Sequence, residues 1–270
     1  MSEQSYTYQD VIRFWRQQNI KTAEDYQRIL SSFKILFSYH SGTIENDRIT
    51  YGDTREIFEN GIVTSYTGDL LTLFEIQNMK DCYEYVIEQA AKHSPLTEKM
   101  ICRIHKLLTK GTYDERRYVV NGERPGEYKK HDYVTGKSET GSLTEDVAEE
   151  MYELVQEINS VSSEDPENII TMAAYAHNVI EHVHPFADGN GRVGRMVADY
   201  LLLIHDLPPL IIFDEDRKLY YEALEVFDLY EDLHPTIELF RYEMEKTWIN
   251  HIIKEKDEKK KRKYGLADYL

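Results

Sequence analysis

Apolar residues recur three and four positions apart along most of this chain. In the segment after residue 22 they fall on one helical face, at Ile29, Leu30, Phe33, Leu36 and Phe37. The same spacing continues through later segments, at 70–91, 144–158, 169–183 and 196–204. Strand-like alternation is absent from these segments. The pattern therefore predicts an all-α protein, a bundle of helices around one apolar core.

Polar residues mark where several of these helices begin. Thr22 followed by Asp25 is typical of a capping box, in which side chain and backbone satisfy each other's hydrogen bonds. Asp165 and Pro166 fit the N-cap and first position of the helix that carries Ile169. Asp53 is expected to cap a short helix near residue 57.

The helical pattern disappears between Arg116 and Ser142. Two β-prone triplets occur there, Tyr118-Val119-Val120 and Tyr133-Val134-Thr135, with turn signals such as Asn121-Gly122. We therefore expect a small β-hairpin, whose edge could add a strand from another protein chain. An ordinary surface hairpin without a binding role remains the alternative.

Length and charge limit the classes of protein to be considered. The 270 residues suit one large domain with appendages, and 21 tyrosines supply ample aromatic side chains for a core. The formal net charge of −17 argues against general binding to nucleic acid or to anionic membranes. The most apolar window, 200–213, is interrupted by charged residues and prolines, so it is not expected to span a bilayer.

Cysteine usage and the chain ends indicate the compartment. Cys82 and Cys102 both lie in apolar helical patterns, which favours buried thiols in a reducing environment over a disulfide. The first residues are polar and carry no secretory signal. We therefore expect a cytoplasmic protein. The charged run at 254–263 is interpreted as a solvated tail, with docking to an acidic partner as the alternative.

The richest chemistry lies between two predicted helices, in residues 184–195. Pro185 should end the first helix, and a glycine turn at 189–191 should open the second. Free backbone N–H groups at such a helix start bind phosphate, and Arg192 and Arg195 add two guanidinium groups on one face. Asp188 is an oxygen ligand suited to Mg²⁺, and His184 is a candidate base.

These residues match a family signature at every specified position. The stretch reads His-Pro-Phe-Ala-Asp-Gly-Asn-Gly-Arg-Val-Gly-Arg and resembles the Fic pattern His-x-Phe-x-Asp/Glu-Gly-Asn-Gly-Arg-x-x-Arg. The resemblance implies a Fic-fold helical bundle with a β-hairpin flap over the active site. It also implies transfer of AMP from ATP to a Ser, Thr or Tyr hydroxyl of a target protein, with release of pyrophosphate.

The resemblance assigns a role to each residue of the signature. His184 would deprotonate the target hydroxyl, and Asp188 would hold Mg²⁺. The phosphates of ATP would be held by Gly189, Asn190, Gly191, Arg192 and Arg195, with Arg192 on the β-phosphate and Arg195 on the γ-phosphate. Phe186 would anchor the loop in the core. Gly194 stands inside a helix, where close approach of another element would explain a glycine.

An upstream segment resembles the inhibitory motif of the same family. Ser41-x-x-x-Glu45-Asn46 fits Ser/Thr-x-x-x-Glu-Gly/Asn. The resemblance implies that Glu45 pairs with Arg195 and displaces the γ-phosphate, while Ser41 helps to fix the motif. A helix-terminal glutamate on a solvated face is the plain alternative.

Other family features match only in part. Gly126-Glu127-Tyr128-Lys129 approximates the family's Gly-x-Tyr-Arg before the flap, and residues 138–143 lack its His-x-x-Pro-Pro. Tyr220 and Tyr221 resemble the tyrosine pair that lines the adenine site. Asp228 stands where several relatives have asparagine.

The expected organisation has three parts. Residues 1–50 carry N-terminal helices with the inhibitory motif, 51–245 form the catalytic core, and 246–270 form the end of the last helix and a charged tail. The implied partners are ATP, Mg²⁺ and protein targets that dock at the flap residues Tyr133, Val134 and Thr135. Self-modification is also expected, and a homodimer is left open.

Three other functions fit parts of the sequence. The same fold could remove AMP or transfer phosphate. A metallohydrolase could use His177, Glu181, His182 and His184 as ligands, although this leaves both arginines without a role. A binding module without catalysis is the third alternative.

Overall fold

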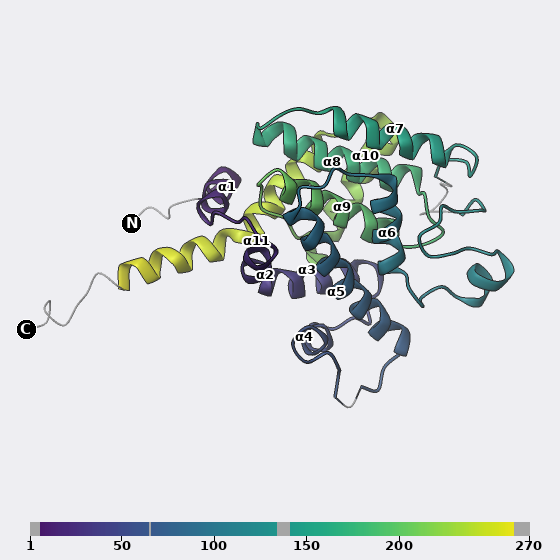
Figure 1. Cartoon of the computed structure of the whole chain (residues 1–270), viewed down its shortest axis with the longest axis horizontal. Helices are drawn as coiled ribbons and strands as arrows, with labels where there is room; N and C mark the ends of the chain where they lie inside the picture. The colour runs from purple at the N-terminus through teal and green to yellow at the C-terminus, as the bar shows by residue number, and fades with distance from the viewer. Residues whose placement is uncertain (1–5, 65, 134–140, 262–270) are drawn as a thin grey trace, which may run out of the picture.

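The chain forms a helical bundle, seen in a computed structural model that describes residues 6–64, 66–133 and 141–261 (Figure 1). The N-terminal half contains α1 (Tyr8–Gln17), α2 (Ala23–Ile29), α3 (Ser31–Glu45), α4 (Tyr51–Asn60), α5 (Leu70–Ala91) and α6 (Glu98–Leu108). The C-terminal half contains α7 (Val147–Ser160), α8 (Pro166–Val183), α9 (Asn190–Ile204), α10 (Arg217–Tyr230) and α11 (His234–Lys261). Two short turns complete the order, η1 (Arg116–Val120) after α6 and η2 (Asp214–Asp216) before α10. The predicted all-α architecture is confirmed.

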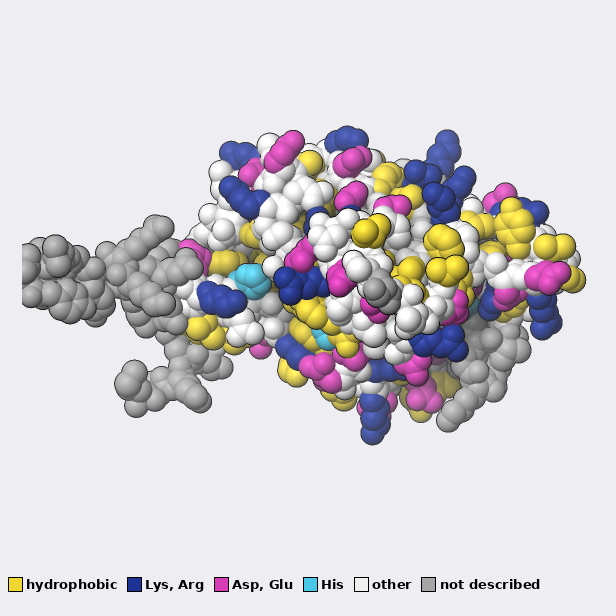
Figure 2. Space-filling model, turned by 90° about the horizontal axis from the view of Figure 1, so that it is seen from below, with side chains coloured by type: hydrophobic (Ala, Val, Ile, Leu, Met, Phe, Trp, Pro, Cys, Tyr) yellow, Lys and Arg dark blue, Asp and Glu magenta, His cyan; other side chains and the backbone are white. Residues whose placement is uncertain are grey.

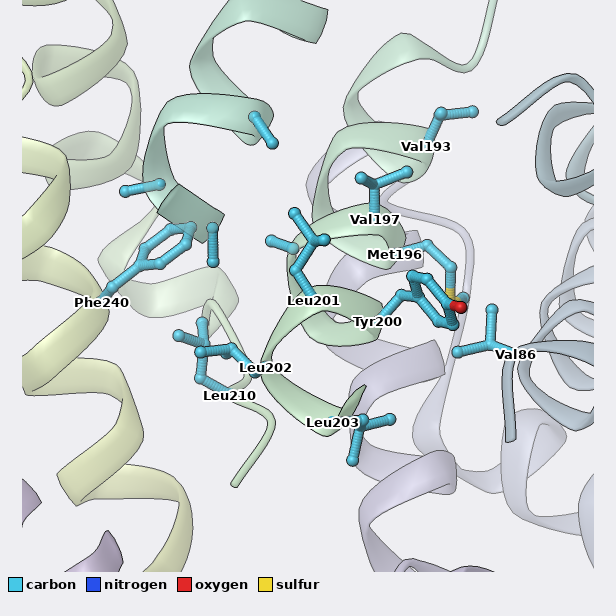
Figure 3. Packing of buried hydrophobic residues seen from close by; sticks show 14 of the residues in the cluster. Val86, Val193, Met196, Val197, Tyr200, Leu201, Leu202, Leu203, Leu210 and Phe240 are labelled. Carbon is cyan, nitrogen blue, oxygen red and sulfur yellow. The ribbon is translucent and has the colours of Figure 1, made fainter. Parts of the chain in front are cut away.

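The bundle is built around α9, which packs most extensively against α8. Nearly every side chain of α9 is buried, including polar Arg192 and Arg195. Figure 3 shows Met196 and Tyr200 beside Val86 of α5, whereas Leu202 lies on the side of α9 that faces Phe240 of α11. A helix that is buried all round is held in a fixed place by its neighbours, so the residues at its N-terminus are positioned rigidly.

The outer helices close the core from both ends of the chain. α1 packs on α11, and the rings of Trp15 and Trp248 meet edge to face with centroids 5.2 Å apart. Phe33 of α3 also stacks on the Trp248 ring, with centroids 5.7 Å apart. The C-terminal end of α11 projects beyond the bundle, on the side where α1 lies (Figure 1). The α3 helix is therefore anchored in the core, which matters because it carries Ser41 and Glu45.

The predicted helix starts are mostly confirmed. Thr22 and Asp25 form the expected capping box of α2, and Asp165 caps α8 with Pro166 at its first position. Asp53 was assigned wrongly as a cap. The N-cap of α4 is Thr50, whose hydroxyl accepts a hydrogen bond from the Asp53 N–H at 3.1 Å. Threonine and aspartate are both good caps, and the sequence does not show which of the two begins the helix.

The predicted strand at Tyr118-Val119-Val120 is wrong. These residues belong to η1, a turn of π-helix, and no strand occurs in the described residues. The carboxylate of Asp114 accepts the Arg117 N–H at 2.8 Å and so fixes the start of the turn. The Arg124 guanidinium covers the Tyr118 ring at 4.0 Å. Val134 and Thr135 of the predicted hairpin lie outside the described residues.

A buried side chain replaces the backbone ladder that the hairpin was expected to have. The Glu123 carboxylate, 1% exposed, accepts the Lys130 N–H at 3.0 Å and the Tyr133 hydroxyl at 2.9 Å. The Tyr133 hydroxyl in turn accepts a hydrogen bond from Asn121 at 2.9 Å. These contacts join the two arms of the segment. β-propensity alone does not reveal such a carboxylate-centred connection.

The structure bears on three further expectations, which concern membrane spans, cysteine thiols and surface charge. No described helix is both long and apolar enough to cross a membrane. Cys82 and Cys102 are free thiols; Cys82 is buried as expected, whereas Cys102 is only partly buried. Burial raises the pKa of Cys82 far above its usual value. Figure 2 shows acidic and basic side chains interspersed on one face of the molecule. On that face the net charge is not gathered into one patch.

Candidate active site

The loop between α8 and α9 gathers the predicted site. His184 is the C-cap of α8 and has a left-handed backbone with φ 52°, a conformation that costs a non-glycine residue energy and often occurs at functional sites. Pro185 follows it and prevents α8 from continuing. The carbonyl of Pro185 accepts the Lys129 N–H at 2.9 Å, which ties the segment after η1 to the loop.

The His184 ring is held in one orientation. Its Nδ1 lies 3.2 Å from the carbonyl of Glu181, so Nδ1 carries the proton and donates it there. Burial and the nearby Lys129 ammonium lower the pKa of His184, although the hydrogen bond to Glu181 opposes them. The imidazole is therefore neutral at physiological pH, with the lone pair of Nε2 free to accept a proton. This is the state that a general base requires.

Two stacked side chains, Phe186 and His105, support the loop from the core. The Phe186 ring is fully buried and stacks on His105 of α6, with centroids 3.8 Å apart. His105 Nε2 donates to the carbonyl of Asp188 at 3.1 Å, and its Nδ1 accepts the Gly126 N–H at 2.8 Å. Burial lowers the pKa of His105 to about 3, which keeps the ring neutral, and the two hydrogen bonds fix its tautomer. The predicted anchoring role of Phe186 is confirmed.

Asn190 has a different position from the one expected. Its amide accepts the Phe186 N–H at 2.9 Å and donates to the Phe186 carbonyl at the same distance. The side chain is 2% exposed and closes the loop on itself. The side chain of Asn190 therefore stabilises the loop, and its backbone N–H is available for a phosphate site.

The N-terminus of α9 has the features of an anion site. Gly189 is its N-cap and has φ 80°, a conformation that favours glycine. Its N–H donates to Asp188 Oδ1 at 2.8 Å. The N–H groups of Asn190, Gly191 and Arg192, the first turn of the helix, have no hydrogen-bond partner in the described part of the chain. Such unpaired N–H groups attract phosphate.

Arg192 adds a buried guanidinium whose nearest carboxylates lie beyond hydrogen-bond distance. It is 4% exposed, and its Nη1 and Nη2 lie 3.7 Å from Glu75 and 3.8 Å from Asp188. Its buried Nε has no hydrogen-bond partner among the described residues. Because a buried guanidinium normally satisfies its donors, these distances leave capacity for an anionic ligand.

Asp188 can serve as the predicted Mg²⁺ ligand. Its side chain is 39% exposed, and its Oδ2 has no hydrogen-bond partner within the residues that the structure describes. Carboxylate oxygen is the donor that Mg²⁺ prefers, and Mg²⁺ commonly binds one or two carboxylates together with substrate phosphates and water. A single carboxylate beside an anion site fits that arrangement.

Arg195 is clamped by the helix that carries the predicted inhibitory motif. It is 3% exposed. Nε donates to the Ser41 hydroxyl at 2.9 Å, and Nη2 donates to the Ser41 carbonyl at 3.1 Å and to Glu45 Oε1 at 2.7 Å. Nη1 donates to the Tyr220 hydroxyl at 3.1 Å. The structure thus brings Ser41, Glu45 and Arg195 together, in the pairing that the family resemblance implies.

The Glu45 carboxylate is ionised in this position. Partial burial by itself raises its pKa, but attraction to Arg195 and Arg192 outweighs that effect and holds the pKa below its usual value. Gly191 leaves the room that the pair needs. A Cβ on Gly191 would lie 2.5 Å from Glu45 Oε1 and 3.0 Å from Arg195 Nη1.

The two predicted adenine-site tyrosines differ in exposure. Tyr220 is 1% exposed and belongs to the Arg195 hydrogen-bond network. Tyr221 is 43% exposed and lies against the Arg217 guanidinium, with its ring centroid at 5.5 Å. Asp228 is paired with His182 at 2.8 Å. Tyr221 is therefore the only one of the two tyrosines with a face open to a ligand.

The metallohydrolase hypothesis finds no support in the geometry. Among the described residues, only His40, Asp214 and Glu215 bring three potential ligand atoms within 4.8 Å of one another. His177 is fully buried beside Gly194, and His182 is paired with Asp228. The four predicted ligands thus lie in different surroundings, although helical spacing puts His177, Glu181 and His184 roughly on one face.

Sequence reasoning missed two residues that organise the site. His105 supports the loop carbonyl at Asp188, and Glu181 accepts the Tyr220 hydroxyl at 2.8 Å. Neither belongs to the signature. A buried polar residue on an otherwise apolar helical face is the signal that could have identified His105, which follows Ile104 on α6.

Gly194 is explained by close approach, as predicted. A Cβ at this position would lie 2.6 Å from Nδ1 of the fully buried His177 on α8. We expect Gly194→Ala to lower the free energy of unfolding by about 1–3 kcal/mol, because overpacking outweighs the gain in helix propensity. Denaturant unfolding measures this. Gly52→Ala is the control, since a Cβ there meets only Thr50 Oγ1 at 3.8 Å, and a Gly194→Ala protein as stable as that control would contradict the explanation.

Solved structures share the whole fold. The chain superposes on a Fic-domain-containing signaling protein from Bacteroides thetaiotaomicron with TM-score 0.74 at 23% identity, covering 89% of this chain and 93% of that one. Fic-1 from Caenorhabditis elegans gives TM-score 0.73 at 22% identity, covering 93% and 73%. At these identities the likeness establishes the architecture.

Sequence comparisons agree with this fold. The chain is 28% identical over 216 residues to protein adenylyltransferase fic-1 of Caenorhabditis briggsae, covering 78% of this chain and 40% of the relative. It is 30% identical over 190 residues to protein adenylyltransferase Fic of Drosophila melanogaster, covering 70% and 36%. The chain thus spans about two fifths of the length of these curated relatives. A family model described as Fic/DOC matches residues 95–202, the segment that includes the loop and most of α9, and the chain belongs to this family.

Proposed function

We propose that this chain is a protein adenylyltransferase, which transfers AMP from ATP to a Ser, Thr or Tyr hydroxyl of a target protein. The observation that carries the proposal is the neutral His184 beside the unpaired N–H groups of α9 and two buried guanidinium groups. The names of the relatives point to the same reaction. The catalytic core would comprise residues 51–245, and residues 1–50 would supply the inhibitory segment.

His184 is the proposed general base. As the target hydroxyl oxygen attacks the α-phosphorus, Nε2 takes the hydroxyl proton, and the bond from the α-phosphorus to the bridging oxygen breaks. Pyrophosphate leaves with the electrons of that bond, and AMP remains on the target. The Glu181 carbonyl holds Nδ1–H, so the base keeps its orientation during the transfer.

The N-terminus of α9 and its arginines are the proposed phosphate site. The N–H groups of Asn190 and Gly191 would hold phosphate oxygens, and Arg192 would neutralise the β-phosphate of the leaving group. Arg195 would hold the γ-phosphate and thereby direct the α-phosphorus towards His184. Tyr221 would cover the adenine ring with its open face, while Tyr220 would act through Arg195.

Asp188 is the proposed residue for Mg²⁺. A bound Mg²⁺ would neutralise charge that develops on the phosphates. Asp188 would offer this cation the oxygen that the loop leaves open, because its other oxygen accepts the Gly189 N–H.

Asp188→Asn tests this role. The amide keeps the shape of the side chain but removes the anionic oxygen, so we expect the Mg²⁺ concentration for half-maximal AMP transfer to rise about tenfold, equivalent to about 1.4 kcal/mol. Titration of Mg²⁺ after treatment with EDTA measures it. Transfer that is insensitive to both EDTA and the substitution would contradict the assignment.

Glu45 is the proposed inhibitor of the reaction. Its carboxylate uses Arg195 Nη2, a donor that the γ-phosphate would need. ATP would then bind with the α-phosphorus out of line with His184. Ser41 fixes the pair by holding two further guanidinium donors. The proposed control is thus a competition between two anions for one cation.

Protein targets are proposed to dock beside the loop, on the segment that begins at Tyr133. The Tyr133 hydroxyl is held by Glu123. Val134 and Thr135 would present the target hydroxyl to His184, although they lie outside the described residues. Self-modification of exposed hydroxyls is part of the same proposal, and a homodimer remains open.

Incubation of Glu45→Gly protein with labelled ATP and a cell lysate tests the proposed reaction. Mass spectrometry of the labelled proteins should find AMP on hydroxyl side chains, and His184→Ala should remove the label. Two labels on ATP separate the alternatives, because phosphotransfer would deposit the γ-phosphate and not AMP. Release of AMP from a pre-modified target would instead indicate removal of AMP.

A further inference from the structure

Arg195 is approached by carboxylates from two sides. Glu45 of α3 contacts Nη2 at 2.7 Å. On the other edge, Nη1 donates to the Tyr220 hydroxyl at 3.1 Å, and that hydroxyl donates to Glu181 Oε1 at 2.8 Å. The guanidinium therefore has a second support, which is independent of the inhibitory helix.

We propose that Glu181 is a positioning residue that acts through the Tyr220 hydroxyl and holds the Nη1 edge of Arg195 ready for the γ-phosphate. The inference rests on the proposed function, because it concerns the same arginine. It adds a residue outside the family signature and gives it a role in productive ATP binding.

The support persists when Glu45 withdraws. Glu181 lies on α8 and Tyr220 on α10, whereas Ser41 and Glu45 belong to α3. Tyr220 is 1% exposed and its ring lies against His177, with centroids 5.6 Å apart, so its hydroxyl has little freedom. Loss of the contacts from α3 leaves Nη1 in place.

Glu181 and Glu45 also share one small space. Their Oε1 atoms lie 3.1 Å and 2.5 Å from the point where a Cβ on Gly191 would stand. The charged groups around Glu181 are Arg195 of α9, Glu45 of α3, and Tyr220 and Asp228 of α10. Any anion that replaces Glu45 on Arg195 therefore comes close to Glu181.

This proximity makes ATP binding sensitive to the proton on Glu181. Burial raises the pKa of Glu181 to about 7; Arg195 and the Tyr220 hydrogen bond lower it, and Glu45 and Asp228 raise it further. Removing Glu45 takes away one cause that raises the pKa, and a bound γ-phosphate supplies another negative charge. ATP thus binds better when Glu181 is protonated, and its affinity falls as the pH rises through this range.

Substitution of Glu181 leaves the base undisturbed. The contact with His184 comes from the backbone carbonyl of Glu181, which every variant retains. Glutamine keeps an oxygen that accepts the Tyr220 hydroxyl but carries no charge. Alanine removes both the charge and the acceptor. The two variants therefore separate the support of Arg195 from the electrostatic effect.

The test measures ATP affinity by calorimetry at pH 6 and pH 8.5 in the Glu45→Gly background. Glu181→Ala should bind ATP roughly 3- to 10-fold more weakly than Glu181→Gln at both pH values, and more weakly than the parent at pH 6, because a hydrogen-bonded support of Arg195 is lost. Glu181→Gln should match the parent at pH 6 and bind roughly 3- to 10-fold tighter than the parent at pH 8.5, where Glu181 is ionised. Tyr220→Phe should weaken binding as Glu181→Ala does, and combining the two should add little.

Tyr175→Phe is the matched control, since Tyr175 lies on the same helix and donates to Glu157 at 2.6 Å, away from Arg195. It should leave the affinity unchanged. Equal pH dependence of the parent and Glu181→Gln, or equal affinities of the Gln and Ala variants, would overturn the inference. If the Glu45→Gly protein binds ATP but transfers no AMP, the proposed function fails, and the affinity series still decides the role of Glu181.

Discussion

Replacing His184 with alanine is expected to reduce AMP transfer by at least about 10²-fold, the lower limit for a lost general base. ATP affinity should stay within about twofold of the parent protein. The two effects separate because, in the proposed mechanism, the imidazole acts on the target hydroxyl, whereas the phosphates would be held by the N–H groups of α9 and by Arg192 and Arg195. The neutral ring with a free Nε2 is the structural reason for the assignment.

The measurement uses the Glu45→Gly background, so that the parent rate is high enough to detect a large loss. Rates are compared at saturating ATP, and affinity is measured by calorimetry. His182→Ala is the control, because this neighbouring histidine lies on the same helix and pairs with Asp228 instead. The metallohydrolase hypothesis expects both substitutions to abolish activity. AMP transfer by His184→Ala within about threefold of the parent would disprove the role of the base.

The helices could be predicted because their determinants are local. The spacing of apolar residues in α5 predicted Leu70–Ala91 to the residue, and Thr22 with Asp25 predicted the start of α2. The turn at 184–195 could be predicted in the same way. Its proline, glycines and asparagine act on backbone only a few residues away, so their spacing already determines the turn.

The predictions that were wrong or missing concern structure that depends on contacts between distant segments. Tyr118 to Val120 have the composition of a strand, but the buried Glu123 carboxylate holds Lys130 and Tyr133 in place of a ladder. Tertiary context overrides β-propensity in such a case. The same limitation applies to His105, whose partner Asp188 is 83 positions away. No pattern in the sequence states which buried polar side chain meets which backbone group.

The proposed inhibitory motif is an intermediate case. Its spacing could be matched in the sequence, but its partner could not, because Glu45 and Arg195 are 150 residues apart. The family resemblance supplied the pairing, and the geometry agrees with it. Glu181 had neither kind of signal. It entered the sequence analysis only as a candidate metal ligand, and its contact with Tyr220 becomes visible only when α8 and α10 are placed together.

Glu45→Gly is expected to increase AMP transfer at subsaturating ATP, including transfer to exposed hydroxyls of the protein itself. The Arg195 guanidinium can serve either the Glu45 carboxylate or the γ-phosphate. A charge-assisted hydrogen bond of this kind contributes about 1–3 kcal/mol, so its removal should improve productive ATP binding roughly 5- to 150-fold. The Glu45 side chain is 35% exposed, and solvent screening places the gain near the lower end of that range.

Glu45 is the last residue of α3, where glycine disturbs the helix little. Glu45→Gln, which keeps the shape without the charge, should give an intermediate gain. Arg195→Ala in the Glu45→Gly background should remove the gain, because the released guanidinium is the group that orients the phosphate. Initial rates with labelled ATP and one fixed target decide the matter, and equal rates for the parent and Glu45→Gly would mean that the enzyme is constitutive and that the ion pair serves stability alone.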